Sequence, residues 1–391
     1  MSSRTKAPIA AGLAATVFAA IPLLLPAAVR AQSAAQPAIG TIQELGRALF
    51  ADRNLSFTRT QSCVSCHSPE LAFTDPKELG KIEGAVSVGA DGHSFGDRNS
   101  PTAAYAAFAP EFHIAADGEP AGGFFWDGRA QTLEEQAGGP PLNPVEMGMP
   151  DKQSIAARIK EEPQLVEAFQ SLFGPAVLED PEKAYEAVTK AIAAYERTAD
   201  LSPFDSKYDR SLRGQATLTA AETQGRDLFF ARSGCGSCHL SNPGGFSEKE
   251  VFTSFKYYNL GTPQNRNVRA LNGSKPGFID AGLAANPKAP GAPYAGRFKV
   301  PTLRNVAITG PYMHNGIFKE LRTVLAFHQR LSAGGPQTNP ETGQPWDSPE
   351  VPANLASAKL KEAPAFNKPE TAALIAFLKT LTDQRYERLL E

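Results

Sequence analysis

The sequence predicts a mostly α-helical protein with two tandem domains, long loops and little strand. The main observation is an internal repeat, because a Cys-x-x-Cys-His motif occurs at residues 63–67 and again at 235–239. A Gly-Arg pair in a helical apolar pattern precedes each motif, at Gly46-Arg47 and at Gly225-Arg226. A length of 391 residues favours two domains, and few segments show the alternation typical of strands.

Each motif is the attachment signature of a c-type haem. Two thiols add to the vinyl groups of one porphyrin, and the adjacent histidine faces the iron. All four cysteines lie in these motifs, namely Cys63, Cys66, Cys235 and Cys238. A redox dithiol or a zinc site would leave a histidine after both pairs unexplained. We therefore expect two covalently bound haem c groups in two cytochrome c-like domains, with His67 and His239 as axial iron ligands.

The N-terminus has the pattern of an export signal. Arg4 and Lys6 precede a mostly apolar run, and Val29-Arg30-Ala31 fits a cleavage site. We expect a signal peptide over residues 1–31, a disordered leader over 32–40, and a periplasmic protein without a membrane span after cleavage. Export agrees with the cysteines, because c-type haem is attached outside the cytoplasm.

The expected N-terminal domain covers residues 41–212 and the C-terminal domain covers 213–391, with the crossing between them at 201–214. Helices are expected where apolar residues recur at spacings of three and four; their ranges are 41–52, 151–174, 181–198, 321–331 and 368–383. A capping box at Thr219 and Glu222 opens another helix. Loops are expected at 68–100, 240–300 and 333–354. The last helix has a predicted buried stripe of Leu374, Ile375, Phe377, Leu378 and Leu381. The net charge of −2 implies no nucleic acid and no anionic membrane as partner.

The sixth ligand of each iron must come from the remaining histidines and methionines. His328 lies on a helical apolar face beside Phe327, where a histidine is either a ligand or a satisfied core residue, and we favour the ligand. His93 lies in a glycine-rich loop, where it is either the tentative sixth ligand of the first iron or a solvated side chain.

Five further motifs make the whole chain after the signal peptide resemble the bacterial di-haem cytochrome c peroxidase and MauG family. They occupy residues 98–102, 125–130, 143–148, 300–305 and 311–316. The resemblance implies that the N-terminal haem reacts with peroxide and that the C-terminal haem receives electrons from an outside donor.

The resemblance also implies roles for single residues. Trp126 matches the tryptophan that relays electrons between the haems, and Glu146 matches the acid/base of the peroxide pocket. Gln136 matches the amide beside it, and Pro140 matches the proline over the first haem in the MauG branch. A calcium ion between the domains is implied at the positions of Asn99, Thr309 and Pro311, two of which would offer backbone carbonyl oxygens.

One position departs from the family. The peroxidases have methionine and MauG has tyrosine as sixth ligand of the electron-receiving haem, where this chain has His328. We expect a bis-histidine haem, which generally has a lower potential than a His/Met haem. Met313 is the runner-up ligand. His93 lies in the loop that carries a blocking histidine in the reductively activated peroxidases, and without that ligand the first iron is open, as in MauG.

Three hypotheses about function follow. In the first, a periplasmic di-haem peroxidase reduces hydrogen peroxide with electrons from a small cytochrome c or cupredoxin. In the second, a MauG-like enzyme uses high-valent iron to oxidise aromatic residues of a partner protein. In the third, the protein is a plain electron carrier, which would need no acid/base pocket of the kind that Glu146, Gln136 and Trp126 imply. Family members often form homodimers, so a homodimer is an expected assembly.

Overall fold

The computed structural model describes residues 39–76, 84–232, 234–240, 249–362 and 365–390, so the predicted signal peptide lies outside the described residues. Within these ranges the chain is mainly helix and loop. Among the described residues, strands occur only as two antiparallel pairs of two-residue strands. They are β1 (His113–Ile114) with β2 (Pro120–Ala121) and β3 (Tyr257–Tyr258) with β4 (Phe298–Lys299). The predicted mostly α class is confirmed.

The first half of the chain is built around the packing of α1 on α6. Its helices are α1 (Ile42–Ala51), α2 (Cys63–Cys66), α3 (Leu133–Ala137), α4 (Lys152–Lys160), α5 (Pro163–Phe173) and α6 (Pro181–Glu196). Thr41 and Glu44 form a capping box that starts α1, close to the predicted residue. Leu45 and Leu49, four residues apart on one helix face, are fully buried in the first core.

The second half is built in the same way around α8 and α12. Its helices are α7 (Lys207–Leu212), α8 (Ala220–Asp227), α9 (Arg266–Leu271), α10 (Leu321–Gln329), α11 (Ser357–Glu362) and α12 (Lys368–Lys379). The predicted capping box of Thr219 and Glu222 starts α8. Phe229, Phe252 and Phe377 contact one another in the second core.

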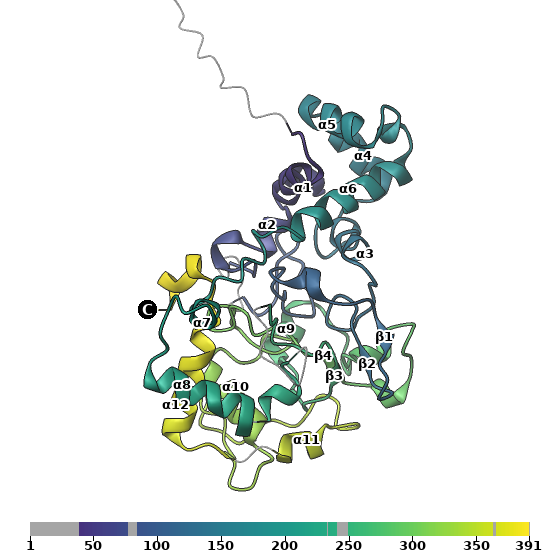
Figure 1. Cartoon of the computed structure of the whole chain (residues 1–391). Helices are drawn as coiled ribbons and strands as arrows, with labels where there is room; N and C mark the ends of the chain where they lie inside the picture. Colours follow the sequence, from purple (N-terminus) through teal and green to yellow (C-terminus); the bar gives the residue numbers. More distant parts are fainter. Residues whose placement is uncertain (1–38, 77–83, 233, 241–248, 363–364, 391) are drawn as a thin grey trace, which may run out of the picture. The chain divides into compact units, whose positions relative to one another are not determined.

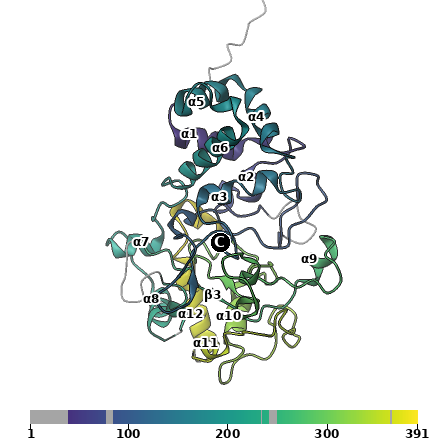
Figure 2. The ribbon, with the colours of Figure 1, turned by 90° about the vertical axis from the view of Figure 1, so that its right-hand side faces the viewer.

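The two glycines of the repeated Gly-Arg pairs lie at corresponding helix crossings. A Cβ atom on Gly46 would lie 1.8 Å from the Ala191 carbonyl oxygen of α6, and one on Gly225 would lie 1.9 Å from the Ala373 carbonyl oxygen of α12. Only glycine allows such close approach of two helix backbones. Figures 1 and 2 show α1 beside α6 and α8 beside α12. The repeat seen in the sequence is therefore a repeat of helix packing.

Several predicted ranges need correction. The helix expected over 151–174 is two helices, because Glu162 is extended and Pro163 starts α5; a residue before proline avoids helical backbone angles. The crossing at 201–214 contains α7, and the loop at 240–300 contains α9 with β3 and β4. In the predicted stripe of α12, Ile375 is only half-buried. The domain boundary between residues 212 and 213 stays a prediction.

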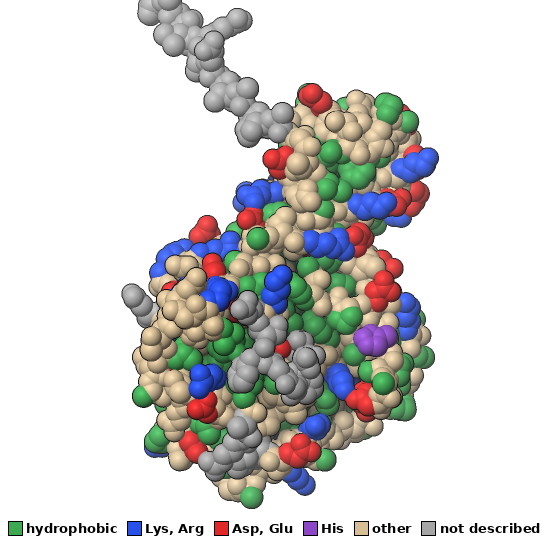
Figure 3. Space-filling view, viewed as in Figure 1, with side chains coloured by type: hydrophobic (Ala, Val, Ile, Leu, Met, Phe, Trp, Pro, Cys, Tyr) green, Lys and Arg blue, Asp and Glu red, His purple; other side chains and the backbone are tan. Residues whose placement is uncertain are grey.

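Charged side chains of both signs are interspersed over the face shown in Figure 3. This distribution agrees with the near-zero net charge. No helix of the described ranges combines the length and apolar character needed to cross a bilayer.

Replacing Gly225 by alanine is expected to lower the unfolding temperature of the haem-loaded protein, since the new methyl group would collide with the α12 backbone. Overpacking of this kind costs about 1–3 kcal/mol, and more where backbones must separate. Gly40→Ala is the matched control, because the nearest heavy atom to a Cβ at Gly40 is a carboxylate oxygen of Glu44, at 3.7 Å. Equal unfolding temperatures for Gly225→Ala and the parent protein, measured by calorimetry, would contradict the packing argument.

Candidate functional site: two histidines held for iron

The first Cys-x-x-Cys-His motif folds as one helical turn, α2, with His67 directly after it. The His67 amide donates to the Cys63 carbonyl at 2.8 Å, and ring atom Nδ1 lies 3.1 Å from the Phe73 carbonyl oxygen. A carbonyl only accepts, so Nδ1 carries the proton and the lone pair is on Nε2. Burial lowers the pKa of His67, which keeps the ring neutral. A neutral imidazole fixed by its other nitrogen is the form that binds iron.

The second motif repeats this arrangement. The His239 amide donates to the Cys235 carbonyl at 2.8 Å, and Nδ1 lies 3.2 Å from the Phe252 carbonyl oxygen. Burial, and then the nearby His328, lower the pKa of His239 to about 4. The accepting residues Phe73 and Phe252 share left-handed backbone angles, with φ of 55° and 54°. The repeat therefore includes the histidine acceptors, although no sequence motif marks them.

A cavity of about 600 Å³ opens beside the first motif. This volume is within the roughly 300–1,000 Å³ that cofactor sites occupy. Cys63, Cys66 and His67 all line it, and no disulfide joins the four cysteines. The thiols and the imidazole thus meet in one space, so the residues present fit a haem attached through both sulfurs.

Glu146 lines the same cavity, in the loop that follows a turn at Pro140–Leu142. Its Oε1 atom accepts a hydrogen bond from the Asn143 side-chain amide at 2.7 Å. Burial raises the pKa of Glu146, while Asn143 and the Arg129 guanidinium act in the opposite direction. Sequence reasoning missed Asn143, although it lies three residues before Glu146 in the quoted motif.

Gln136 and Pro140 also line this cavity. Gln136 comes from the short helix α3, and a bond from the Tyr185 hydroxyl to the Gly138 carbonyl at 2.6 Å holds the turn that follows. Gln136, Pro140 and Glu146, which the resemblance placed at the first haem, therefore all line one cavity. The amide that donates to the Glu146 carboxylate is that of Asn143.

Trp126 lies on the cavity wall and is bonded to both halves of the chain. Its indole Nε1 donates to the Asn99 carbonyl at 2.8 Å, and its own carbonyl accepts from the Lys299 amide at 3.0 Å. The Lys299 ammonium bonds the Gly123 carbonyl at 2.5 Å, and burial lowers the pKa of Lys299 to about 8. One hydrogen bond thus holds the indole and another holds the backbone of Trp126, so the ring keeps one orientation beside the cavity.

The three predicted calcium positions, Asn99, Thr309 and Pro311, line the same cavity. The Asn99 side-chain amide donates to the Ala85 carbonyl at 3.1 Å. Among the described residues no cluster of three or more His, Cys, Asp or Glu could hold a metal ion. The predicted set contains none of these residue types, and it stays a prediction.

His93 is not brought to the cavity. Its side chain is 81% exposed, and its Nδ1 atom lies 2.8 Å from the Asp91 carbonyl oxygen. The Asp91 carboxylate lies 3.3 Å from the other ring nitrogen. In this structure His93 is a surface histidine bound to its own loop, and its role as tentative ligand has no geometric support.

His328 is brought to the second motif. It lies on α10, and its Nδ1 atom is 2.8 Å from the Val324 carbonyl oxygen, which leaves Nε2 as the atom free to bind a metal. His328 is among the groups that lower the pKa of His239, so the two imidazoles lie within range of electrostatic interaction. Met313, the runner-up, lines the first cavity instead.

Comparison with known proteins agrees with this geometry. A sequence model described as di-haem cytochrome c peroxidase matches residues 41–217. The chain belongs to the di-haem cytochrome c peroxidase and MauG family, whose members are di-haem oxidoreductases. Membership implies two haem c groups.

The chain is 49% identical to methylamine utilization protein MauG of Paracoccus denitrificans over 376 residues, which are 96% of each chain. It is 33% identical to cytochrome c peroxidase Ccp of Escherichia coli over 74% of this chain and 53% of that protein. Among solved structures, the diheme peroxidase BthA of Burkholderia thailandensis is 33% identical with a TM-score of 0.75, covering 90% of this chain and 88% of that one. A MauG-like protein associated with microbial copper homeostasis is 30% identical with a TM-score of 0.65, covering 90% and 93%.

Replacing Asn143 by alanine is expected to raise the pKa of Glu146 further, because the hydrogen bond to the ionised carboxylate is lost while its burial remains. Difference infrared spectroscopy of the carboxyl band against pH measures this shift. Asn54→Ala, which removes an amide bonded to the Arg158 carbonyl instead, is the control. A titration of Glu146 at the same or a lower pH in Asn143→Ala would show that the bond has no such effect.

Proposed function

We propose that this protein is a MauG-like di-haem enzyme that uses hydrogen peroxide to oxidise aromatic residues of a partner protein. The observation that carries the proposal is the 49% identity to a MauG protein over 96% of both chains, together with a carboxylate in the first haem cavity. The chain would act after export to the periplasm, with a peroxide-reactive half at 41–212 and an electron-transfer half at 213–391.

Glu146 is the proton-handling group of this proposal. The haems, when bound, supply the peroxide reduction and the one-electron transfers. Cleavage of the O–O bond needs a proton moved from one peroxide oxygen to the other, which a carboxylate in the cavity can accept and return. Because Glu146 must be ionised to accept that proton and burial raises its pKa, activity falls on acidification at a higher pH than for an exposed glutamate.

Trp126 would carry electrons between the two halves. Reduction of peroxide to two water molecules takes two electrons and two protons, so electrons from the partner's aromatic residue must cross the protein. The indole Nε1 of Trp126 donates to the carbonyl of Asn99, and the backbone carbonyl of Trp126 accepts from the amide of Lys299, which lies in the other half. A calcium ion at Asn99, Thr309 and Pro311 would stiffen this same junction.

The peroxidase reading is the second candidate, favoured by the likeness to the solved diheme peroxidase BthA. Its electron source would be a small cytochrome c or cupredoxin. A plain electron carrier is the weakest reading, because the half-buried carboxylate of Glu146 in the cavity would then have no use.

The experiment that tests the proposal is peroxide turnover by the haem-loaded protein with two kinds of electron source. Proteins of the same periplasm, incubated with peroxide and enzyme, are expected to gain oxygen or crosslinks at Trp or Tyr, read by peptide mass spectrometry. Reduced cytochrome c and reduced cupredoxin are expected to be oxidised slowly or not at all. Fast, saturable oxidation of either donor without modified residues would replace the proposal with the peroxidase.

Glu146→Gln keeps the shape of the side chain but removes its basic form. The expected result is a slowing of the peroxide reaction by roughly 10²- to 10⁴-fold, as for loss of an acid/base group. Stopped-flow absorbance of the Soret band measures it, with Glu135→Gln on the outer side of α3 as control. A rate within the error of the parent protein would remove Glu146 from the mechanism.

His328 is proposed as the sixth ligand of the iron on His239. Low-temperature electron paramagnetic resonance is expected to show a bis-histidine low-spin signal. That signal should be lost in His328→Ala and retained in His93→Ala and Met313→Leu. An unchanged signal in His328→Ala would show that another residue, or none, binds the iron.

A further inference from the structure

The two histidine acceptors are held by corresponding turns in the two halves. In the first half, the Thr102 hydroxyl donates to the Ala72 carbonyl, next to Phe73, at 2.6 Å. In the second half, the Thr302 hydroxyl donates to the Val251 carbonyl, next to Phe252, at 2.6 Å. Each threonine hydroxyl also accepts from the amide two residues later, at 2.9 and 3.0 Å. The repeat thus extends to a Pro-Thr turn behind each acceptor.

The third residue after each threonine has the same unusual backbone. Tyr105 and Asn305 both have a φ of 61°, in the left-handed region that side-chain-bearing residues seldom adopt. Asparagine tolerates this region, while a tyrosine held there indicates that its surroundings fix it. The two residues occupy equivalent places in the two halves although their side chains differ.

Both side chains donate to one carboxylate. The Tyr105 hydroxyl donates to Oδ1 of Asp383, and the Asn305 amide donates to Oδ2 at 2.8 Å. The Asp383 amide donates back to Oδ1 of Asn305 at 2.8 Å. Asp383 is fully buried and lies just after α12. One buried side chain therefore offers one oxygen to each half.

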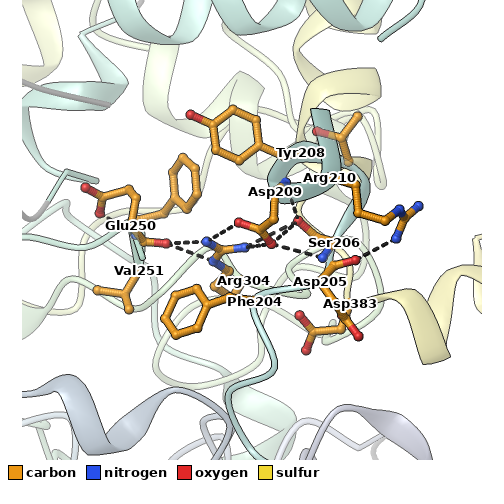
Figure 4. A network of polar contacts seen from close by, with 12 residues as sticks. Phe204, Asp205, Ser206, Tyr208, Asp209, Arg210, Glu250, Val251, Arg304 and Asp383 are labelled. Atoms are coloured by element: carbon orange, nitrogen blue, oxygen red, sulfur yellow. Dashed lines mark hydrogen bonds and ion pairs between the residues drawn. The ribbon is translucent and has the colours of Figure 1, made fainter. Parts of the chain in front are cut away.

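The link to the second histidine passes through Arg304, which precedes Asn305 in the chain. Figure 4 shows Arg304 with its partners Asp209 and Glu250. The fully buried Arg304 guanidinium is bidentate to Asp209, at 2.6 and 2.9 Å, and bonds the Glu250 carbonyl twice, at 2.9 and 2.6 Å. The Glu250 carboxylate accepts from the Phe252 amide at 2.7 Å. Phe252 in turn supplies the carbonyl that fixes the ring of His239.

The link to the first histidine is shorter. Two residues before Tyr105, the Ala103 amide donates to the Phe73 carbonyl at 3.1 Å. That carbonyl is also the acceptor for the ring of His67. The Tyr105 amide donates to the Leu201 carbonyl at 3.0 Å, and this second hydrogen bond also holds the backbone of the turn in place.

We infer that Asp383 is a positioning residue that ties the two histidine-holding turns together, so that the ligand geometry at each haem depends on both halves. A carboxylate suits this task because both oxygens accept, whereas an amide could accept on one side only. A buried donor left without its acceptor is destabilising, so each turn is held against movement. The inference rests on the two haems of the family and is independent of which substrate is oxidised.

The test is a substitution in one half with a readout at the other. Tyr105→Phe removes only the hydroxyl of the first half. It is expected to shift the electron paramagnetic resonance g-values of the haem on His239, assigned with variants that lack one cysteine pair. Asn305→Gly, which keeps the left-handed backbone, is expected to shift the spectrum of the haem on His67. In an Asp383→Ala background, which removes both acceptor oxygens, Tyr105→Phe should add little to the shift already present.

Tyr208→Phe is the matched control, because the buried Tyr208 hydroxyl has no hydrogen-bond partner among the described residues. It is expected to leave both haem spectra as in the parent protein. The inference is overturned if Tyr105→Phe and Asn305→Gly each change only the haem of their own half, or change neither. It is also overturned if the Tyr105→Phe shift is equally large with and without Asp383. All of these readouts are spectra of the resting protein, so they stand whether or not the proposed substrate class is right.

Discussion

The hydrogen bond from each motif histidine to a phenylalanine carbonyl is the constraint on which the rest of the structure depends. It puts the proton on Nδ1 and leaves Nε2 of His67 and of His239 with a lone pair for iron. Phe73 and Phe252 present these carbonyls from the same left-handed backbone conformation. The Thr102 and Thr302 turns behind them bond the neighbouring carbonyls of Ala72 and Val251.

The two halves share this frame but differ in the side chains that lie near the motif histidine. In the first half the cavity wall carries Glu146, a carboxylate whose pKa is raised by burial. In the second half α10 brings His328 to the neighbourhood of His239. An open position beside an acid/base group suits reaction with peroxide, and two imidazoles suit electron transfer. Trp126 is bonded to both halves, through its indole to Asn99 and through its carbonyl to Lys299.

Local signals made much of this structure predictable. The cysteine motifs, the capping box at Thr219 and the periodic apolar residues of α1 each involve residues a few positions apart. The break between α4 and α5 at Pro163 is also a local signal, because a proline disfavours helical angles in the residue before it, but the single helix expected over 151–174 did not include it. Asp383 was not predictable, because its partners Tyr105 and Asn305 lie 278 and 78 residues away in the chain. The acceptors of the histidine rings are backbone carbonyls, which leave no mark in a residue pattern.

The central claim is that one chain holds two covalent haems, one on each histidine. Intact mass spectrometry of the exported protein, followed by peptide mapping, tests it most directly. The account predicts a mass increased by two haems, with one on the peptide containing Cys63 and Cys66 and one on the peptide containing Cys235 and Cys238. A protein that carries a single haem, or none, after expression with a complete haem-attachment system would contradict it.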